Sequence, residues 1–164
     1  MNVVVFCLVV AYCYALRDTF ELTYDSNEPI EIITTTRGRT YTHTNETSSI
    51  ELADIVCKGY GQRSASFEDE DADMTVYNYM TDLFPGKIFG IGLSVVPGNK
   101  FKWDDNTKFK YNRAENVPGT DKKIFYGMTM KNTDNPGSWT GFFGDAEVAG
   151  HICQKVDKSP SDIL

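Results

Sequence analysis

The sequence predicts an α+β domain with two helices, short antiparallel strands and long loops. Two helix-like patterns lie between residues 49 and 80, and short apolar or alternating runs follow from Lys87 onward. Two stretches rich in Asn, Gly, Pro, Asp and Thr, residues 112–123 and 131–141, are typical of loops. Helices and strands in separate parts of a chain indicate the α+β class.

The N-terminus has the pattern of a secretory signal. Residues 3–14 form an uncharged apolar run, which Ala15 follows. We expect residues 1–15 to be a signal peptide cleaved after Ala15. Arg17 and Asp18 end the run before the roughly 20 apolar residues that a membrane span needs. The mature protein is therefore expected to be secreted and extracellular, without membrane insertion.

The first elements follow the expected signal peptide. Residues 16–36 are predicted to be an N-terminal strand segment, and residues 30–36 and 39–44 read as a hairpin around Arg37 and Gly38. A helix is predicted next, capped by Ser48 or Ser49 and ending at Gly59.

The remaining elements alternate between apolar runs and turns. A second helix is predicted over residues 67–80, because the acids of 68–73 suit a helix N-terminus. Strands are predicted at 88–94, 124–126 and 148–155, with a hairpin in which 101–103 and 109–111 flank the turn 104–107. Residues 157–164 are expected to be a flexible tail.

Charge and cysteine content limit the function. The net charge of −7 makes a nucleic-acid partner improbable. Loss of the signal peptide removes Cys7 and Cys13, which leaves Cys57 and Cys153 in an oxidising route. A single structural disulfide, closing a loop of 153 − 57 = 96 residues, is the simplest prediction. Asn45 begins a glycosylation sequon with Glu46 and Thr47.

Residues 37–156 resemble the C-type lectin-like domain family. The resemblance rests on motifs in the right order: the two cysteines, Ser64 to Ser66, Gly90 to Leu93, Trp103 to Asn106, and Tyr111 with Asn112. It implies a disulfide between the first helix and the last strand, and a binding site in the loops of 112–123 and 131–145. It also implies a recognition module, of the kind found among small secreted defence proteins of invertebrates and in innate immunity.

Two departures from the family pattern bear on the ligand. The second, inner disulfide is missing, since its cysteines would fall near Met130 and Gly144. The family binds sugar and calcium through Glu-Pro-Asn or Gln-Pro-Asp and Trp-Asn-Asp triplets. Here Pro118 is flanked by Val117 and Gly119, and Trp139 is followed by Thr140 and Gly141. Calcium needs six to eight oxygens, so we expect no cofactor. A calcium site that neighbouring side chains form after a shift of the loops is kept as an alternative hypothesis.

The sequence contains no recognised catalytic motif. Neither His43 nor His151 lies in a motif that supplies a nucleophile. We therefore expect a non-enzymatic protein whose partner is a glycan or an extracellular protein. Self-association is a third hypothesis, and the oligomeric state is not predicted. Trp139, Tyr126 or Phe142 could stack on a sugar ring, although core packing is the alternative for these aromatics. The candidate ligand-binding residues are Glu115, Asn116, Asp134, Asn135, Trp139, Thr140 and Asp145.

Overall fold

A computed structural model describes residues 30–34, 38–98, 100–115 and 121–156. The signal peptide, most of the segment 16–36, Asn116, the triplet around Pro118 and the tail 157–164 lie outside these residues. The α+β class is confirmed. The elements in chain order are β1 Ile30–Thr34, β2 Thr40–His43, β3 Ser48–Ser49, the 3-10 helix η1 Ile50–Leu52, α2 Ala53–Gly59, β4 Arg63–Ser64, α3 Glu70–Leu83, β5 Ile88–Val96, β6 Lys100–Trp103, β7 Ile124–Thr129, β8 Trp139–Phe142, β9 Glu147–Val148 and β10 Gly150–Gln154.

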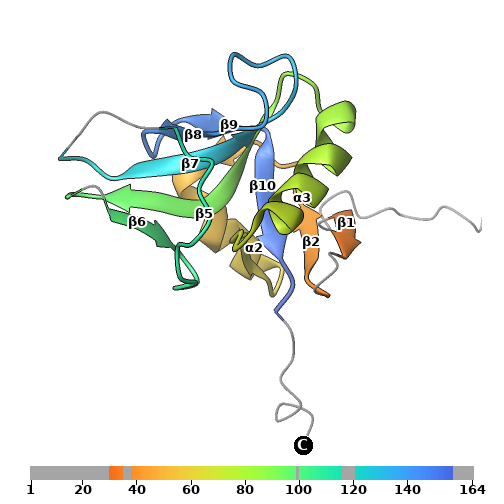
Figure 1. Cartoon of the computed structure of the whole chain (residues 1–164), viewed down its shortest axis with the longest axis horizontal. Helices are drawn as coiled ribbons and strands as arrows, with labels where there is room; N and C mark the ends of the chain where they lie inside the picture. Colours follow the sequence, from red (N-terminus) through yellow and green to blue (C-terminus); the bar gives the residue numbers. More distant parts are fainter. Residues whose placement is uncertain (1–29, 35–37, 99, 116–120, 157–164) are drawn as a thin grey trace, which may run out of the picture.

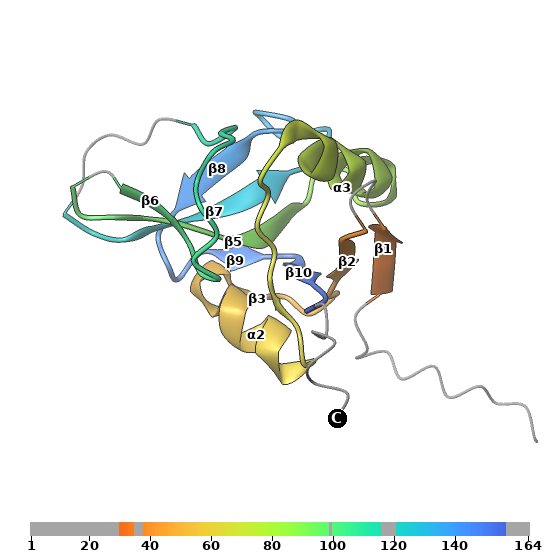
Figure 2. The same ribbon diagram turned by 60° about the horizontal axis from the view of Figure 1, so that its bottom comes forward.

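One sheet runs through the molecule in the order β1-β2-β10-β5-β7-β8. Strand β10 joins its two halves, because it pairs antiparallel with β2 and parallel with β5. Strand β4 adds to β10 and β6 adds to β5, while β3 and β9 form a separate pair. Helices α2 and α3 cover opposite sides of β10 (Figures 1 and 2). The described helices include none long and apolar enough to cross a membrane.

The hairpin predicted at the N-terminus is present, with Ile30 opposite His43 and Thr34 opposite Thr40. The first helix ends at Gly59, as predicted, but its start differs from the prediction. Ser49 makes no side-chain cap, and the hydroxyl of Ser48 instead lies 2.7 Å from Nε2 of His151. Gly59 is the last helical residue, and the left-handed position belongs to Gly61, with a φ of 69°.

The second helix begins at Glu70, three residues later than predicted. Asp69 is its N-cap, since its Oδ1 accepts a hydrogen bond from the backbone N–H of Ala72 at 3.0 Å. Phe67 stays outside the helix because its ring is fully buried against Tyr41, with ring centroids 5.3 Å apart. The helix continues to Leu83, beyond the predicted end at Met80.

The hairpin predicted around residues 104–107 is wrong. Strand β6 pairs with β5, and Trp103 lies opposite Leu93. Residues 109–111 are not a strand; the Phe109 ring stacks on Phe101 with centroids 4.7 Å apart. Strand β8 was also missed, because part of it lies in the stretch 131–141 that was predicted to be a loop.

Buried aromatic side chains dominate the core, and one disulfide closes it. Cys57 of α2 is bonded to Cys153 of β10, as predicted, and both are fully buried. The bond therefore fastens a helix to the strand that joins the two halves of the sheet. The largest fully buried side chains include Trp103, Trp139, Tyr41, Tyr126 and Phe67.

Candidate functional site

A depression of about 270 Å³ lies where β5, β7 and β8 meet the loop after β7. We call it the β8 depression. Its polar rim comes from the loop, and Phe142 of β8 is a half-buried ring in its wall. Its lining residues are Gly86, Ile88, Thr129, Asn132, Thr133, Asp134, Asn135, Thr140 and Phe142.

Hydrogen bonds to neighbouring elements hold the loop after β7. The backbone N–H of Lys131 donates to the Thr81 hydroxyl of α3 at 2.9 Å, and its carbonyl accepts from Gly86 N–H at 2.6 Å. Thr133 donates its hydroxyl to the Met130 carbonyl at 2.7 Å. Asn132 takes a φ of 65°, which an asparagine tolerates better than most residues. The loop is therefore tied to α3 and to the turn before β5, beside which it runs in Figure 1.

Ser138 connects several of the predicted ligand residues. Its hydroxyl lies 3.2 Å from Oε1 of Glu115, 2.8 Å from the Asn135 carbonyl and 3.2 Å from the Thr140 hydroxyl. The Thr129 hydroxyl also donates to the Asn135 carbonyl. Sequence reasoning missed Ser138, although its place directly before Trp139 was a signal. Ser138 fixes these backbone and hydroxyl groups, which leaves the side chains of Asp134 and Asn135 exposed on the rim.

The structure brings four of the seven predicted residues together. Asp134, Asn135 and Thr140 line the β8 depression, and Glu115 reaches Thr140 through Ser138. Asn116 lies outside the described residues. Two predicted residues lie elsewhere: Trp139 and Asp145.

Trp139 cannot stack on a ligand, because its side chain is fully buried. The alternative of core packing is correct for Trp139, and also for Tyr126, whose exposed fraction is 0%. The Tyr126 hydroxyl donates to the Glu115 carbonyl at 3.3 Å, and burial raises the pKa of that hydroxyl. Phe142 is the one aromatic of the three that reaches the depression.

Trp139 is anchored by Asp73 of α3, which the sequence analysis also missed. Asp73 is fully buried, and it accepts hydrogen bonds from Trp139, Arg113 and Tyr111. Burial raises the pKa of its carboxyl group, and these three hydrogen bonds oppose the shift. The signal was present in the sequence, because Asp73 precedes Val76 and Met80 at helical spacing and so lies on their apolar face.

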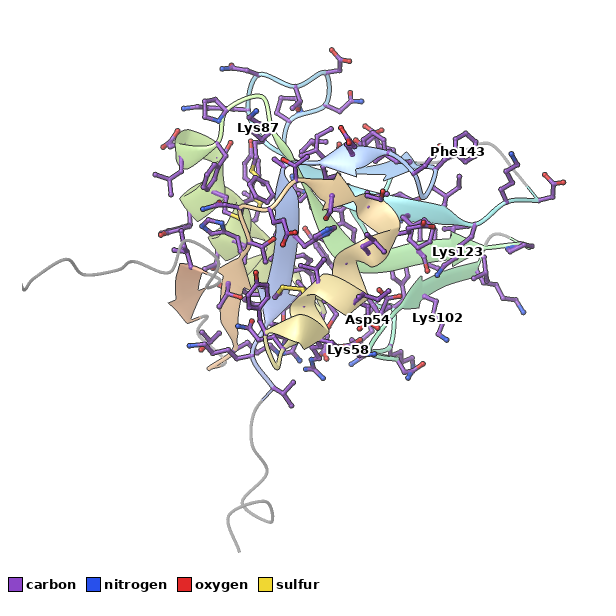
Figure 3. All side chains as sticks on the ribbon, turned by 180° about the vertical axis from the view of Figure 1, so that it is seen from behind. Asp54, Lys58, Lys87, Lys102, Lys123 and Phe143 are labelled. Atoms are coloured by element: carbon purple, nitrogen blue, oxygen red, sulfur yellow. A yellow bond between two sulfur atoms is a disulfide. The ribbon has the colours of Figure 1, made fainter. Side chains whose placement is uncertain are left out.

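Asp145 lies in a different depression, of about 480 Å³. Its lining combines two cations with two phenyl rings: Nζ of Lys123 lies 4.4 Å from the Phe125 ring centroid, and Nζ of Lys122 lies 5.5 Å from that of Phe143. Phe143 is 55% exposed. Figure 3 shows Lys123 and Phe143 well apart from Lys87, whose sequence neighbours Gly86 and Ile88 line the β8 depression.

The β8 depression is poor in the carboxylates that calcium sites usually supply. Asp134 is its only carboxylate among the described lining residues, and the Thr140 and Gly141 that follow Trp139 supply one hydroxyl. Calcium takes six to eight oxygens, largely from carboxylates and amides. Within the part of the chain that the structure describes, no three His, Cys, Asp or Glu side chains form a metal-binding group.

Ser48 and His151 form a serine–histidine pair, but its geometry opposes catalysis. His151 is fully buried, burial lowers its pKa to about 4, and its Nδ1 has no hydrogen-bond partner among the described residues. A buried N–H without an acceptor is costlier than an unpaired lone pair, so the proton belongs on Nε2. Nε2 then donates to Ser48 Oγ and cannot accept its proton, as a general base would have to do.

By sequence, no protein-family model and no curated protein matches the chain. By structure, it is similar to the C-type lectin CEL-I from Cucumaria echinata, with a TM-score of 0.62 and 16% identity over 73% of this chain and 91% of that one. The chain has the C-type lectin-like fold. The calcium-independent C-type lectin SPL-2 from Saxidomus purpuratus has a TM-score of 0.59 at 13% identity, covering 73% of this chain and 88% of that one. A calcium-independent type II antifreeze protein has a TM-score of 0.55 at 22% identity, covering 72% of this chain and 86% of that one.

The structural neighbours confirm the resemblance predicted from the motifs. At these identities the likeness establishes the C-type lectin-like fold and leaves the ligand to be argued from this chain's own residues. The neighbours include calcium-independent proteins, so the fold itself does not require the metal.

Proposed function

We propose that this protein is a secreted, non-enzymatic recognition module that binds carbohydrate without calcium in the β8 depression. One observation carries the proposal: Asp134 and Asn135 from the loop, with Thr140 and Phe142 from β8, converge on one depression. Carboxylate, amide and hydroxyl groups bond to sugar hydroxyls, and an aromatic ring packs on the apolar face of a sugar. The expected signal peptide supports secretion, and the tautomer of His151 supports a non-enzymatic role.

Glycosylation belongs to the same proposal. Asn45 is exposed just after β2, where a glycan can be attached without disturbing the core. We propose that the secreted protein carries a glycan at Asn45. Peptide mass spectrometry before and after enzymatic glycan removal tests this directly, and an unmodified Asn45 in protein secreted from eukaryotic cells would contradict it.

The carbohydrate proposal is tested on a broad glycan array with the mature protein, residues 16–164, in calcium and in a chelator. We expect the same binding in both buffers. Asn135→Ala removes an exposed amide and keeps the backbone carbonyl that Ser138 uses, so binding should fall about tenfold while the fold persists. The matched control is Asn78→Ala on the exposed side of α3, which should bind normally.

Three outcomes contradict parts of this proposal. Binding lost in the chelator would mean that the loops do assemble a calcium site. An Asn135→Ala variant that binds as well as the control would place the ligand elsewhere. Absence of binding to every glycan in both buffers would contradict carbohydrate recognition as a whole.

A protein partner is the second candidate, and the Lys122, Lys123 and Phe143 depression favours it. Phe143 is an exposed aromatic side chain, and aromatic side chains are enriched at protein interfaces. A Phe143→Ala variant that loses a captured extracellular partner, but keeps glycan binding, would establish this second surface.

A further inference from the structure

A second depression, of about 300 Å³, adjoins the β8 depression. We call it the β9 depression. Gly86 and Ile88 line both depressions. Each alone lies near the lower limit of the roughly 300–1,000 Å³ usual for small-molecule sites, so a ligand that occupies both fits that range better. The β9 depression is lined by Thr47, Gly86, Lys87, Ile88, Glu147, Val148 and Ala149.

Gly86, which has no side chain, lies at the boundary between the two depressions. Gly86 has a φ of 74°, and a Cβ placed on it would find only the Asn132 carbonyl oxygen, at 3.9 Å. The space above this residue is therefore open. A chain-like ligand could pass from one depression to the other across the Gly86 backbone, which the hydrogen bond to Lys131 holds in place.

The β9 depression offers a polar rim over an apolar floor. Thr47, Lys87 and Glu147 are exposed and supply a hydroxyl, an ammonium and a carboxylate. Ile88, Val148 and Ala149 form the floor, where Ala149 N–H donates to the Ile88 carbonyl at 2.9 Å and Val148 pairs with Ser48. A sugar ring presents one apolar face and a hydroxyl edge, and a site fixed in advance loses little entropy on binding it.

We propose that the β9 depression is a second subsite, and that the ligand is an oligosaccharide of at least two units. One unit lies in the β8 depression and the next lies in the β9 depression, with the linkage over Gly86. Lys87 and Glu147 bond to hydroxyl or charged substituents of the second unit. This inference rests on the proposed carbohydrate function.

The test is calorimetry with oligomers of one to six units of glucose, mannose, galactose and N-acetylglucosamine. We expect affinity to rise from one unit to the oligomers in the series that binds. The double variant Lys87→Ala, Glu147→Ala should weaken oligomer binding about tenfold and leave single-unit binding unchanged. Thr47 is kept, because it belongs to the Asn45 sequon.

A third variant places a side chain on the boundary itself. Asparagine tolerates a positive φ, so Gly86→Asn should fold and should weaken oligomers more than single units. Gly61→Asn is the matched control, because Gly61 has a φ of 69° with nothing within 4 Å of a Cβ, and it follows α2. Glycan-free protein carrying Asn45→Gln is measured alongside, since that glycan would lie near Thr47.

The outcomes separate the two proposals. Equal affinity for one unit and for longer oligomers, or a double variant that keeps the rise with length, would overturn the second subsite and leave the proposed function standing. Failure of every series, including the single units, together with an absence of binding on the glycan array, would overturn the proposed function together with this inference.

Discussion

Trp139 in β8 donates a hydrogen bond from Nε1 to Oδ1 of Asp73 in α3 at 2.9 Å, and both side chains are fully buried. The other oxygen of Asp73 accepts from Arg113 Nη1 at 2.6 Å and from the Tyr111 hydroxyl at 3.1 Å. Backbone bonds continue the connection, because Trp139 N–H donates to the Arg113 carbonyl and Glu115 N–H donates to the Trp139 carbonyl. One carboxylate thus joins a helix, a strand and the segment that carries Glu115.

Asp73→Leu should destabilise the fold strongly. It leaves the Arg113 guanidinium and the buried Trp139 N–H without their acceptor, and breaking such a pair costs about 3–5 kcal/mol. Asp73→Asn keeps one acceptor and should cost less. Urea unfolding measures both. Asp82→Asn on the same helix breaks only an exposed pair with Lys131, so its cost should be about 1 kcal/mol or less; equal losses at positions 73 and 82 would contradict the role of the buried network.

His151 should make the protein sensitive to acid. Burial lowers its pKa to about 4, whereas an unfolded histidine has a pKa of about 6.5. The unfolded chain therefore binds more protons between these values. Stability from this group is full above pH 6.5 and falls, by on the order of 3 kcal/mol, as the pH drops toward 4.

The comparison of His151→Gln with the unchanged protein isolates this effect. A glutamine can still contact Ser48, and we expect it to flatten the fall in unfolding free energy between pH 6.5 and 4. A smaller slope should remain, because burial also lowers the pKa of His43. Nuclear magnetic resonance titration of the two histidines gives a direct readout, and a His151 signal that titrates near pH 6.5 would contradict the prediction.

Sequence patterns were sufficient where the determinants are local or where family motifs are ordered along the chain. The hairpin of β1 and β2, the α+β class and the bond between Cys57 and Cys153 were all predicted. The starts of the two helices were not, because they depend on distant partners. Ser48 contacts His151, 103 residues away, rather than the helix. Phe67 is held outside α3 by Tyr41.

Part of the candidate site was also predicted, because local composition indicated it. Asp134, Asn135 and Thr140 lie in stretches whose composition indicated exposed loops, and they do line one depression. Trp139 was misplaced because the direction of its side chain follows from pairing across the sheet, and Asp145 because it lies in the turn between β8 and β9. Trp139 lies opposite Met128 on β7, and its ring meets Asp73 from a helix far away in sequence. Composition alone carries no information about such a partner.

The Cys57–Cys153 disulfide should contribute much of the stability. It closes a loop across a sequence separation of 96 residues, for which chain entropy gives about 4–5 kcal/mol. A Cys57→Ala, Cys153→Ala double variant should show that loss in urea unfolding and should leave no free thiol. Two titratable thiols in the unreduced, unchanged mature protein would contradict the bond itself.

Phe142 and Phe143 are adjacent in sequence but lie in different depressions, which makes them a matched pair for testing the site. Phe142 lines the β8 depression, and Phe143 lies beside Lys122 and Asp145. Phe142→Leu keeps apolar volume and removes the ring face, so glycan affinity should fall about three- to tenfold, in line with the ~0.5–1.5 kcal/mol of an aromatic contact. Phe143→Leu should bind glycan normally. If calorimetry instead showed weaker glycan binding for Phe143→Leu and normal binding for Phe142→Leu, the sugar would bind in the depression that Lys122 and Lys123 line. Only the ring that contacts the ligand can change its affinity in this way.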